Sequence, residues 1–449
     1  MTKPLDGVRV LDLTQVFAGP SCTRILSDLG ADVIRMEAPA RADVTRSLMH
    51  VDNDGQEVPW ERGFYFTIRN AGKKEIVLDL NQLRAQEILR DLIAQSDIVA
   101  ESFTPRVMRA WELDYEHLKA IRPDVIMISL SGYGQDGPCS DWSAYGMSLE
   151  PASGVSQLTG YAGGAPMRSG LSFTDPYSGF LGAGAVLAAL HYRRRTGKGQ
   201  YIDLSEQEAA VPLAGAAIMD FAMNGRLPER IGNRSASAAP QGCYRCAGDD
   251  DWIVISIAND GGWAAFCDAI GHPEWKDDAR FADVLSRHAN HDALDQLIET
   301  WTRDQDHYEA FHLLQRAGIA AAPVLNGKEL LLDPHMRARG QFDEVEQPHQ
   351  GKRPVQRHLA AKFSKFEASA DAAAPTFGQH NKEVLGGLLG LSDEELAQLE
   401  RDGVIASAPT LPVPAQYISR ALKLPYDRFL ELGTLRALEP DYKQTLGLE

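Results

Sequence analysis

Residues 8–37 read VRVLDLTQVFAGPSCTRILSDLGADVIRME, and their pattern indicates the fold of the N-terminal part of the chain. Its first six residues form a mostly apolar run, which indicates a buried strand. Pro20 stands where the first residue of a helix is expected, apolar residues then recur at helical spacing, and Gly30 follows the last of them. A second apolar run starts at Val33. The strand–helix–strand pattern predicts an α/β fold with a Rossmann-like domain.

The loop after the first predicted strand, residues 14–20, lacks a dinucleotide-binding signature. It contains one glycine, Gly19, where Gly-x-Gly-x-x-Gly is needed to bring the backbone close to a pyrophosphate. A second loop, residues 132–137, reads GYGQDG and matches that pattern, but Pro138 and polar residues follow it in place of a helix. Neither loop therefore predicts NAD binding.

Composition excludes several classes of protein. The chain has 449 residues, 44% of them hydrophobic, which is enough for two or three globular domains. Its net charge of −17 argues against nucleic-acid binding and against attraction to a membrane surface. No run approaches the roughly 18 apolar residues of a membrane span, and the first residues lack a signal-peptide core. We expect a cytoplasmic protein with no nucleic-acid and no membrane partner.

The metal-binding residue types are not arranged as a metal site. Cys243 and Cys246 have Cys-x-x-Cys spacing, but the second half of a four-ligand zinc site is missing. The histidines at 288 and 291, and those at 307 and 312, are expected on polar, solvated helix faces. The sequence therefore predicts free thiols and no metal.

Asp175 lies in GLSFTDPYSG (residues 170–179), which we expect to be a loop leading into a small-residue helix at residues 179–190. A carboxylate at the mouth of a helix is stabilised as an anion and could act as a nucleophile. From the residues alone, an Asp before a Pro is more often only a turn or helix-cap residue. The Gly and Ala residues of the helix predict close approach of another backbone, and hence a buried helix.

Breaks in the pattern divide the chain. Ser205 and Glu208 have capping-box spacing and predict a long helix running towards Gly225, with Pro212 as a kink. A polar, Ser/Ala-rich stretch follows, where we place a domain boundary. The predicted parts are a large N-terminal Rossmann-like part (1–224), a small α+β domain (225–340), a return segment that completes the large domain (341–404) and a C-terminal extension (405–449).

Several short motifs together resemble the class III coenzyme A (CoA) transferases of the CaiB/BaiF type, which include formyl-CoA and carnitine-type CoA transferases. The similarity runs from residue 5 to about residue 404. The motifs include LDGVRVLD at 5–12, AGP at 18–20, LGADVIRME at 29–37, NAGKK at 70–74, SGYG at 131–134, TGKGQ at 196–200 and GIAAAPV at 318–324.

The resemblance implies a particular architecture and chemistry. The fold would be a Rossmann-like large domain formed by both chain ends plus a smaller α+β domain, with two subunits interlocked in a homodimer. Asp175 matches the position of the family's covalent nucleophile. It would form a mixed anhydride and then an aspartyl-CoA thioester while CoA moves from an acyl-CoA to an organic acid. Water has to be excluded, because it would hydrolyse these intermediates.

The resemblance also implies which residues bind CoA. By match, the pocket is lined by Gln15, Val16, Ala18, Leu78, Ser102, Phe103 and Tyr145. Packing is an equally good explanation for Val16, Ala18 and Leu78. The arginines that bind the CoA phosphates in formyl-CoA transferases are replaced by Ala38 and Ala110. Arg46, Arg106 and Arg109 are therefore the candidates for phosphate binding, or else ordinary surface cations.

Two features bear on the substrates. Ser and Ala replace the glycine run of the active-site loop of formyl-CoA transferases at residues 234–242, so we do not expect formyl or oxalyl transfer. Phe17, Met147 and Leu149 suggest a bulky organic acid as acceptor, with a dicarboxylate donor such as succinyl-CoA.

Two alternative functions stay open from the sequence. A 2-methylacyl-CoA racemase of the same family needs a second base, a histidine at the position of Tyr145, which this chain lacks. A non-catalytic CoA-binding protein would bind CoA without ever acquiring a covalent adduct.

Overall fold

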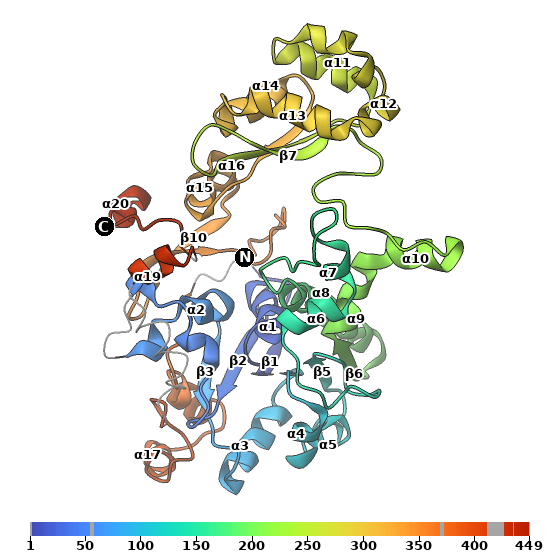
Figure 1. The fold of residues 1–449 in the computed structure, drawn as a ribbon. Coiled ribbons are helices and arrows are strands. Elements are labelled where there is room, and N and C mark those ends of the chain that lie inside the picture. Colours follow the sequence, from blue (N-terminus) through green and yellow to red (C-terminus); the bar gives the residue numbers. More distant parts are fainter. Residues whose placement is uncertain (1, 54–57, 369–371, 411–425, 434, 449) are drawn as a thin grey trace. The chain divides into compact units, whose positions relative to one another are not determined.

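The computed structural model describes residues 2–53, 58–368, 372–410, 426–433 and 435–448 (Figure 1). Contacts divide the chain into two compact units. The first unit comprises Met1–Val155, Arg168–Ile218 and Pro334–Glu449, and the second comprises Ser156–Met167 and Met219–Asp333. Of the predicted C-terminal extension (405–449), residues 411–425, 434 and 449 lie outside the described residues.

A six-stranded parallel sheet forms the centre of the first unit. Its strand order, β3-β2-β1-β4-β5-β6, is that of a Rossmann-like fold, so the fold class predicted from residues 8–37 is confirmed. The carboxyl ends of all six strands meet at one edge. The strands are β1 (Arg9–Leu13), β2 (Asp32–Glu37), β3 (Lys74–Val77), β4 (Ile98–Glu101), β5 (Ile126–Ser131) and β6 (Gln200–Ser205).

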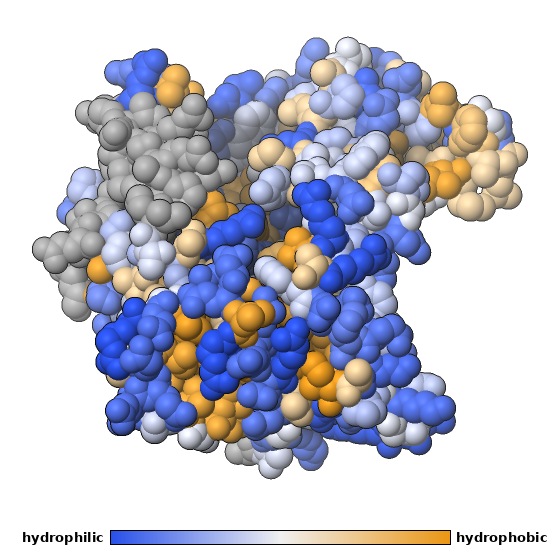
Figure 2. All heavy atoms as spheres, turned by 90° about the horizontal axis from the view of Figure 1, so that it is seen from below, coloured by the Kyte–Doolittle hydropathy of each residue, from blue (hydrophilic) through white to orange (hydrophobic). Residues whose placement is uncertain are grey.

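Both faces of this sheet are covered, as is usual for parallel sheets. Val10 belongs to a core shared with α1 (Ala18–Asp28) and α8 (Thr174–Thr196). Its neighbour Leu11 points to the opposite core, which contains residues of α3 (Leu83–Ala94) and α5 (Tyr115–Ile121). Val384 and Ile405, from the C-terminal part, join this second core. Seen from below the view of Figure 1, the surface is mainly hydrophilic, with separate apolar patches (Figure 2).

Helix α8 differs from the prediction in two ways. It begins at Thr174, so Asp175 lies in the first helical turn and not in a preceding loop. Its glycines do allow close packing on α1, since a Cβ atom on Gly179 would lie 2.7 Å from the carbonyl oxygen of Ala18. The helix is not buried all round, however, because Phe180 and Leu181 are 45% and 42% exposed. Gly179 and Gly182 are buried and approach α1, whereas Gly184 and Ala188 are exposed.

The long helix predicted after Ser205 is interrupted. It consists of α9 (Glu206–Ala210), a 3-10 turn (Val211–Ala214) and α10 (Gly215–Asn224). Pro212 lies in the 3-10 turn, where it has no N–H to donate to the preceding helix. The further helices of the first unit are α2 (Phe64–Asn70), α4 (Pro105–Ala110), α6 (Gly146–Ala152), α16 (Pro334–Arg339), α17 (Asp393–Arg401), α19 (Tyr426–Glu431) and α20 (Tyr442–Leu446).

The return segment contains an antiparallel hairpin of β10 (Phe342–Gln347) and β11 (Gly351–Gln356). A short helix, α7 (Val155–Leu158), lies where the two units join in sequence. Among the described residues, no helix is both long and apolar enough to span a membrane.

The second unit has its own sheet and core. The antiparallel strands β7 (Gln241–Arg245), β8 (Trp252–Ser256) and β9 (Ala320–Pro323) form the sheet. Its helices are α11 (Asp260–Ala269), α12 (Val284–Ala289), α13 (His291–Thr302), α14 (His307–Arg316) and α15 (Gly327–Leu332). The core is apolar and continuous from Ile253 through Phe266 to Leu314.

Candidate active site

The side chain of Asp175 is partly buried in the first turn of α8. It is hydrogen-bonded to the carboxyl group of Glu206, and the Thr174 hydroxyl donates to its Oδ1 atom at 3.4 Å. The first residue of α6, Gly146, lies against the same carboxyl group, because a Cβ atom there would be 2.1 Å from Oδ1. Only a glycine allows the α6 backbone to come this close.

Glu206 is the first residue of α9 and directly follows β6. Backbone contacts fix its position: the Ser205 side chain accepts from the Glu208 N–H at 3.3 Å, and the Gln207 N–H donates to the Gly132 carbonyl at 3.0 Å. Sequence reasoning identified the cap at Ser205 but missed Glu206. The available signal was its place after a strand of the parallel sheet, where ligand-binding residues gather.

Burial dominates the ionisation of both acids. It raises the pKa of Asp175 to about 6, although hydrogen bonds from Glu206 and Thr174 and the positive charge of Arg69 act in the opposite direction. Burial also raises the pKa of Glu206 well above its usual range, and the adjacent negative charge of Asp175 raises it further. Near neutral pH, Asp175 is therefore the anion and Glu206 the acid.

Arg69 on α2 supplies the positive charge that acts on Asp175. Its guanidinium group lies 3.4 Å from the ring centre of Phe17 and 3.8 Å from that of Tyr65, and it donates to the Tyr65 carbonyl at 2.7 Å. Burial lowers the pKa of Arg69 to about 10. Within the described part of the chain, no basic nitrogen lies within 4.0 Å of the Asp175 carboxylate. The aspartate is thus stabilised as an anion without being neutralised by an ion pair.

The loop after β1, which holds Gln15 and Val16, is fixed by other side chains. The Gln15 N–H donates to the Ser102 hydroxyl at 3.0 Å, and the Val16 N–H donates to the Asp43 carboxylate at 3.0 Å. Val16 has a φ of +68°, a left-handed conformation that is unfavourable for a β-branched residue. Such strain persists only when the surroundings enforce it, and it is typical of functional sites.

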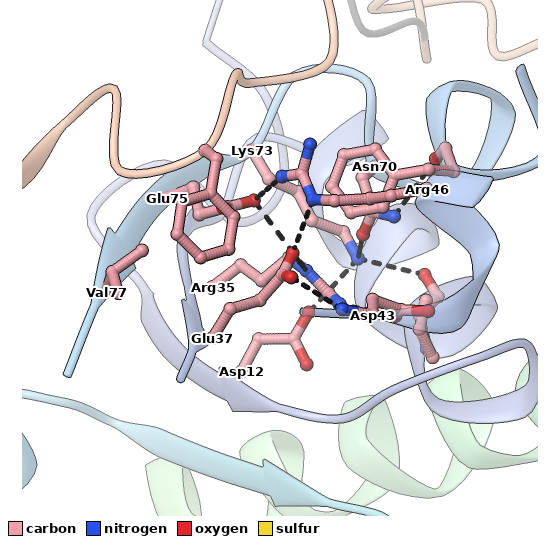
Figure 3. Close-up of polar contacts among 12 residues, drawn as sticks. Asp12, Arg35, Glu37, Asp43, Arg46, Asn70, Lys73, Glu75 and Val77 are labelled. Atoms are coloured by element: carbon pink, nitrogen blue, oxygen red, sulfur yellow. Dashed lines mark hydrogen bonds and ion pairs between the residues drawn. The ribbon is translucent and has the colours of Figure 1, made fainter. Parts of the chain in front are cut away.

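A buried charge cluster holds Val16 in this conformation (Figure 3). The cluster consists of Arg35, Glu37, Asp43, Arg46, Glu61 and Glu75. Arg35 donates to Asp43 at 2.5 Å and to the Thr14 carbonyl at 2.8 Å, so it fixes the loop from a second point. Arg46 is 1% exposed and contacts Glu37, Glu61 and Glu75. Its guanidinium group is paired inside the protein, so Arg46 is neither a free candidate for phosphate binding nor the surface cation that the sequence left as the alternative.

A second buried group lies beside it (Figure 3). The Lys73 ammonium donates to Asp12 at 3.0 Å, to the Thr23 hydroxyl at 2.7 Å and to Asn70 at 2.9 Å. Burial lowers the pKa of Lys73 to about 8. These contacts join the end of β1, helix α1 and the start of β3.

A cavity of about 180 Å³ brings together two of the predicted CoA-binding residues, Gln15 and Phe103. Ala38, Arg41 and Trp111 also line it, and Phe103 packs edge-on against Trp111. Arg41 was not among the arginines singled out from sequence. Arg41 lies three residues after Ala38, the position that matches a phosphate-binding arginine of formyl-CoA transferases. The cavity therefore has an arginine in its lining although residue 38 is alanine.

The other predicted residues are placed differently. Leu78 has no exposed surface and belongs to the hydrophobic core, and Ala18 is 5% exposed at the start of α1. Their burial fits the packing explanation. Tyr145 is 65% exposed, and Arg106 and Arg109 are exposed on α4. Leu149 is buried, so of the two apolar residues Met147 and Leu149 only Met147 has an exposed side chain that a substrate could contact.

One group of side chains in the second unit has the chemistry of a metal site. Ligand atoms of Asp251, His307 and Glu329 lie within 4.8 Å of one another. Nε2 of His307 is 3.2 Å from a Glu329 oxygen, and His307 is 3% exposed. His291 on α13 is also buried, at 4% exposed, so the expectation of solvated helix faces is wrong for both His291 and His307. The absence of a metal stays a prediction.

Comparison with known proteins assigns the chain to a family. The profile described as CoA-transferase family III matches residues 5–381. The chain belongs to this family. Relatives named as transferases of CoA match it over nearly their whole length, so the chain is a family III CoA transferase and acts on CoA thioesters.

Three relatives illustrate the similarity. Succinyl-CoA–D-citramalate CoA-transferase of Chloroflexus aurantiacus is 34% identical, over 90% of this chain and 98% of the relative. Formyl-CoA:oxalate CoA-transferase of Streptomyces avermitilis is 32% identical, over 90% of this chain and 100% of the relative. The crystal structure of a CaiB/BaiF family protein from Brucella suis has a TM-score of 0.78 at 30% identity, covering 86% of this chain and 100% of that one.

Proposed function

We propose that this enzyme moves CoA from a dicarboxylic acyl-CoA donor to an organic acid through covalent intermediates on Asp175. The observation that carries this proposal is the state of the Asp175 side chain. It is partly buried, its pKa is raised to about 6 chiefly by burial, and it is ionised at neutral pH without a direct ion pair. A desolvated carboxylate is a better nucleophile than a hydrated one.

The first half-reaction loads CoA onto the enzyme. Asp175 attacks the carbonyl carbon of the donor thioester, and the C–S bond breaks to leave a mixed anhydride and CoA thiolate. The thiolate then attacks the aspartyl carbonyl. The donor acid leaves, and an aspartyl-CoA thioester remains on the enzyme.

The second half-reaction is the reverse sequence with the acceptor acid. The acceptor carboxylate attacks the aspartyl-CoA thioester and forms a second anhydride. The thiolate attacks the acceptor's carbonyl carbon, which gives the product acyl-CoA and restores Asp175. The enzyme group has to be a carboxylate because, like the donor and acceptor acids, it can form both an anhydride and a CoA thioester.

The substrates are proposed from two sources. The relative at 34% identity is named for succinyl-CoA and D-citramalate, which supports a dicarboxylate donor such as succinyl-CoA. Phe17 and the exposed Met147 favour an acceptor with an apolar or bulky part. We place the CoA itself against Gln15, Val16, Ser102, Phe103 and Arg106, with Arg41 added from the cavity beside Phe103.

The experiment that tests this mechanism traps the covalent intermediate. The enzyme is incubated with succinyl-CoA, treated with hydroxylamine or borohydride and digested with trypsin. Asp175 lies in the tryptic peptide of residues 169–193, whereas Glu206 lies in the separate peptide of residues 199–226. We expect modification of the first peptide in the wild type, and none in Asp175→Asn.

Asp203→Asn is the matched control, because this carboxylate on β6 is exposed and accepts from the Gln135 N–H at 3.0 Å. It should keep the modification. A racemase would instead leave both peptides unmodified and exchange the α-hydrogen of a 2-methylacyl-CoA with deuterated water. That result would replace the transferase mechanism with the alternative one.

A further inference from the structure

The residue that the mechanism above leaves unused is Glu206. Its carboxyl group is hydrogen-bonded to that of Asp175, and no ion pair joins it to a cation in the described part of the chain. Two carboxyl groups can form a hydrogen bond only when one of them carries a proton. The pair in its active form therefore holds one proton and one negative charge.

The position of Glu206 is rigid, which distinguishes it from a chance neighbour. It is flanked by Ser205 and Gln207, and both are tied to the Gly132 carbonyl at the end of β5, at 3.4 and 3.0 Å. The Gln207 amide also donates to the Ala152 carbonyl at 2.8 Å. Helix α9 packs against both α8 and α6, which carry Asp175 and Gly146. Glu206 is thus held opposite Asp175 by the sheet and by two helices.

We propose that Glu206 is a positioning residue that keeps the single proton of the pair. Its O–H donates a hydrogen bond to one oxygen of Asp175 and leaves the other oxygen free to attack. The inference rests on the nucleophilic role proposed for Asp175. During attack, an Asp175 oxygen bonds to the thioester carbonyl carbon and sulfur leaves with the electron pair of the C–S bond. The proton stays on Glu206 throughout, so no other acid or base is needed in this step.

Other charged groups near the pair are already engaged or exposed. Arg69 on α2 acts on Asp175 from a distance, and Glu208 on α9 is exposed. Asp203 on β6 accepts from the Gln135 N–H, Glu150 on α6 from the Ser169 N–H and hydroxyl, and Asp28 on α1 pairs with Arg24. The far end of α8 carries His191 and Arg193, Arg194 and Arg195. The titration of the pair is therefore set by the burial and mutual contact of Asp175 and Glu206, with Arg69 as the one cation that acts on Asp175 among the described residues.

The test compares the pH profiles of kcat/KM for the wild type, Glu206→Gln and Glu206→Leu, with succinyl-CoA as donor. The wild-type profile should be bell-shaped: activity rises as Asp175 ionises and falls when Glu206 loses the shared proton. Glu206→Gln keeps an N–H donor but has no proton to lose, so its alkaline limb should vanish. Glu206→Leu removes the donor, so its acid limb should move up by about one pH unit or more.

Glu208→Gln, on the exposed side of the same helix, should reproduce the wild-type profile. Thermal unfolding of each variant checks that the fold is intact. The proposal is overturned if Glu206→Gln keeps the wild-type alkaline limb or if Glu206→Leu keeps the wild-type acid limb. The trapped label on the peptide of residues 169–193 is measured in the same variants. If the label persists and the variants keep the wild-type pH profiles, the role of Glu206 is rejected and Asp175 stays the proposed nucleophile. If the wild type shows no label, the nucleophilic role of Asp175 is itself rejected.

Discussion

At the scale of single residues, the reactivity of the site depends on the groups around Asp175. Among the described residues, Glu206, Thr174 and Gly146 lie against its carboxyl group, and Arg69 acts on it from further away. Each of these four neighbours affects the charge or the access of the proposed nucleophile. The effect of each should therefore be measurable as a change in rate or in pH dependence, with little change in fold.

Gly146→Ala is expected to reduce kcat by at least about tenfold. The new Cβ atom would lie 2.1 Å from Asp175 Oδ1, so the carboxyl group or the start of α6 has to move, and a displaced nucleophile loses its attack geometry. Steady-state kinetics with succinyl-CoA measures the change. Gly184→Ala on α8, where nothing lies within 4 Å of the added atom, serves as the control and should leave kcat unchanged.

Arg69→Met should move the acid limb of the kcat/KM profile above its wild-type position near pH 6. The positive charge of Arg69 lowers the pKa of Asp175, so its removal lets burial raise that pKa further, while methionine keeps the packing on Phe17 and Tyr65. Activity should fall more at pH 6 than at pH 8. An unchanged acid limb would show that Arg69 does not act on the nucleophile. Arg84→Met, an exposed change on α3, is the control.

At the scale of elements, the site is built from segments that follow the strands of the parallel sheet. The residues 8–37 predicted this sheet correctly, because apolar periodicity and helix-boundary residues report local structure directly. The sequence also singled out Asp175 as the candidate nucleophile, and Gln15 and Phe103, which line one cavity, as CoA-binding residues. It did not reveal Glu206 or the burial of Arg46, because both depend on partners far away in sequence: 31 residues separate Asp175 from Glu206, and 29 separate Arg46 from Glu75.

The loop after β1 gives a test at this scale. Asp43→Asn keeps an oxygen for the Val16 N–H but leaves Arg35 without its closest charge, and breaking a buried pair typically costs about 3–5 kcal/mol. We expect a free energy of unfolding lowered by roughly that amount and a higher KM for acyl-CoA, since residues 14–16 lose their anchor. Denaturant unfolding and kinetics measure the two effects.

Asp343→Asn is the matched control for this change. It breaks a partly exposed pair with Arg357 and should cost no more than about 1 kcal/mol. Equal losses in the two variants would contradict a special role for the buried cluster.

At the scale of the whole molecule, the buried acids make stability depend on pH. Glu206 and Asp175 have higher pKa values in the folded protein than their ordinary values of 4.5 and 3.8. Between those ordinary values and the raised ones, the unfolded chain binds fewer protons than the folded chain, so stability falls as pH rises. Glu206→Gln should weaken this fall. Denaturant unfolding at intervals from pH 5 to pH 9 measures the slope, and Glu208→Gln should keep the wild-type slope.

The subunit number is a second prediction at this scale. Single chains leave a set of large apolar side chains on α8 and α10 exposed, among them Phe180, Leu181 and Phe221. Exposed apolar surface of this kind is typical of subunit interfaces. We expect a homodimer, with a mass of about twice 49.2 kDa in multi-angle light scattering. Phe180→Asp combined with Leu181→Asp should shift the mass towards that of one chain, and a wild-type mass of 49.2 kDa would contradict the prediction.

The smaller unit is assembled from two separate pieces of sequence, Ser156–Met167 and Met219–Asp333. The shorter piece is held by the longer one, since the Gly232 N–H donates to the Gly160 carbonyl at 3.0 Å and Arg230 donates to the Gly164 carbonyl at 2.8 Å. A recombinant fragment that starts at residue 219 would therefore lack a part of its own structure. Anyone wishing to express this lobe alone has to fuse residues 156–167 to it through a new linker, and limited proteolysis should not release it as one continuous polypeptide.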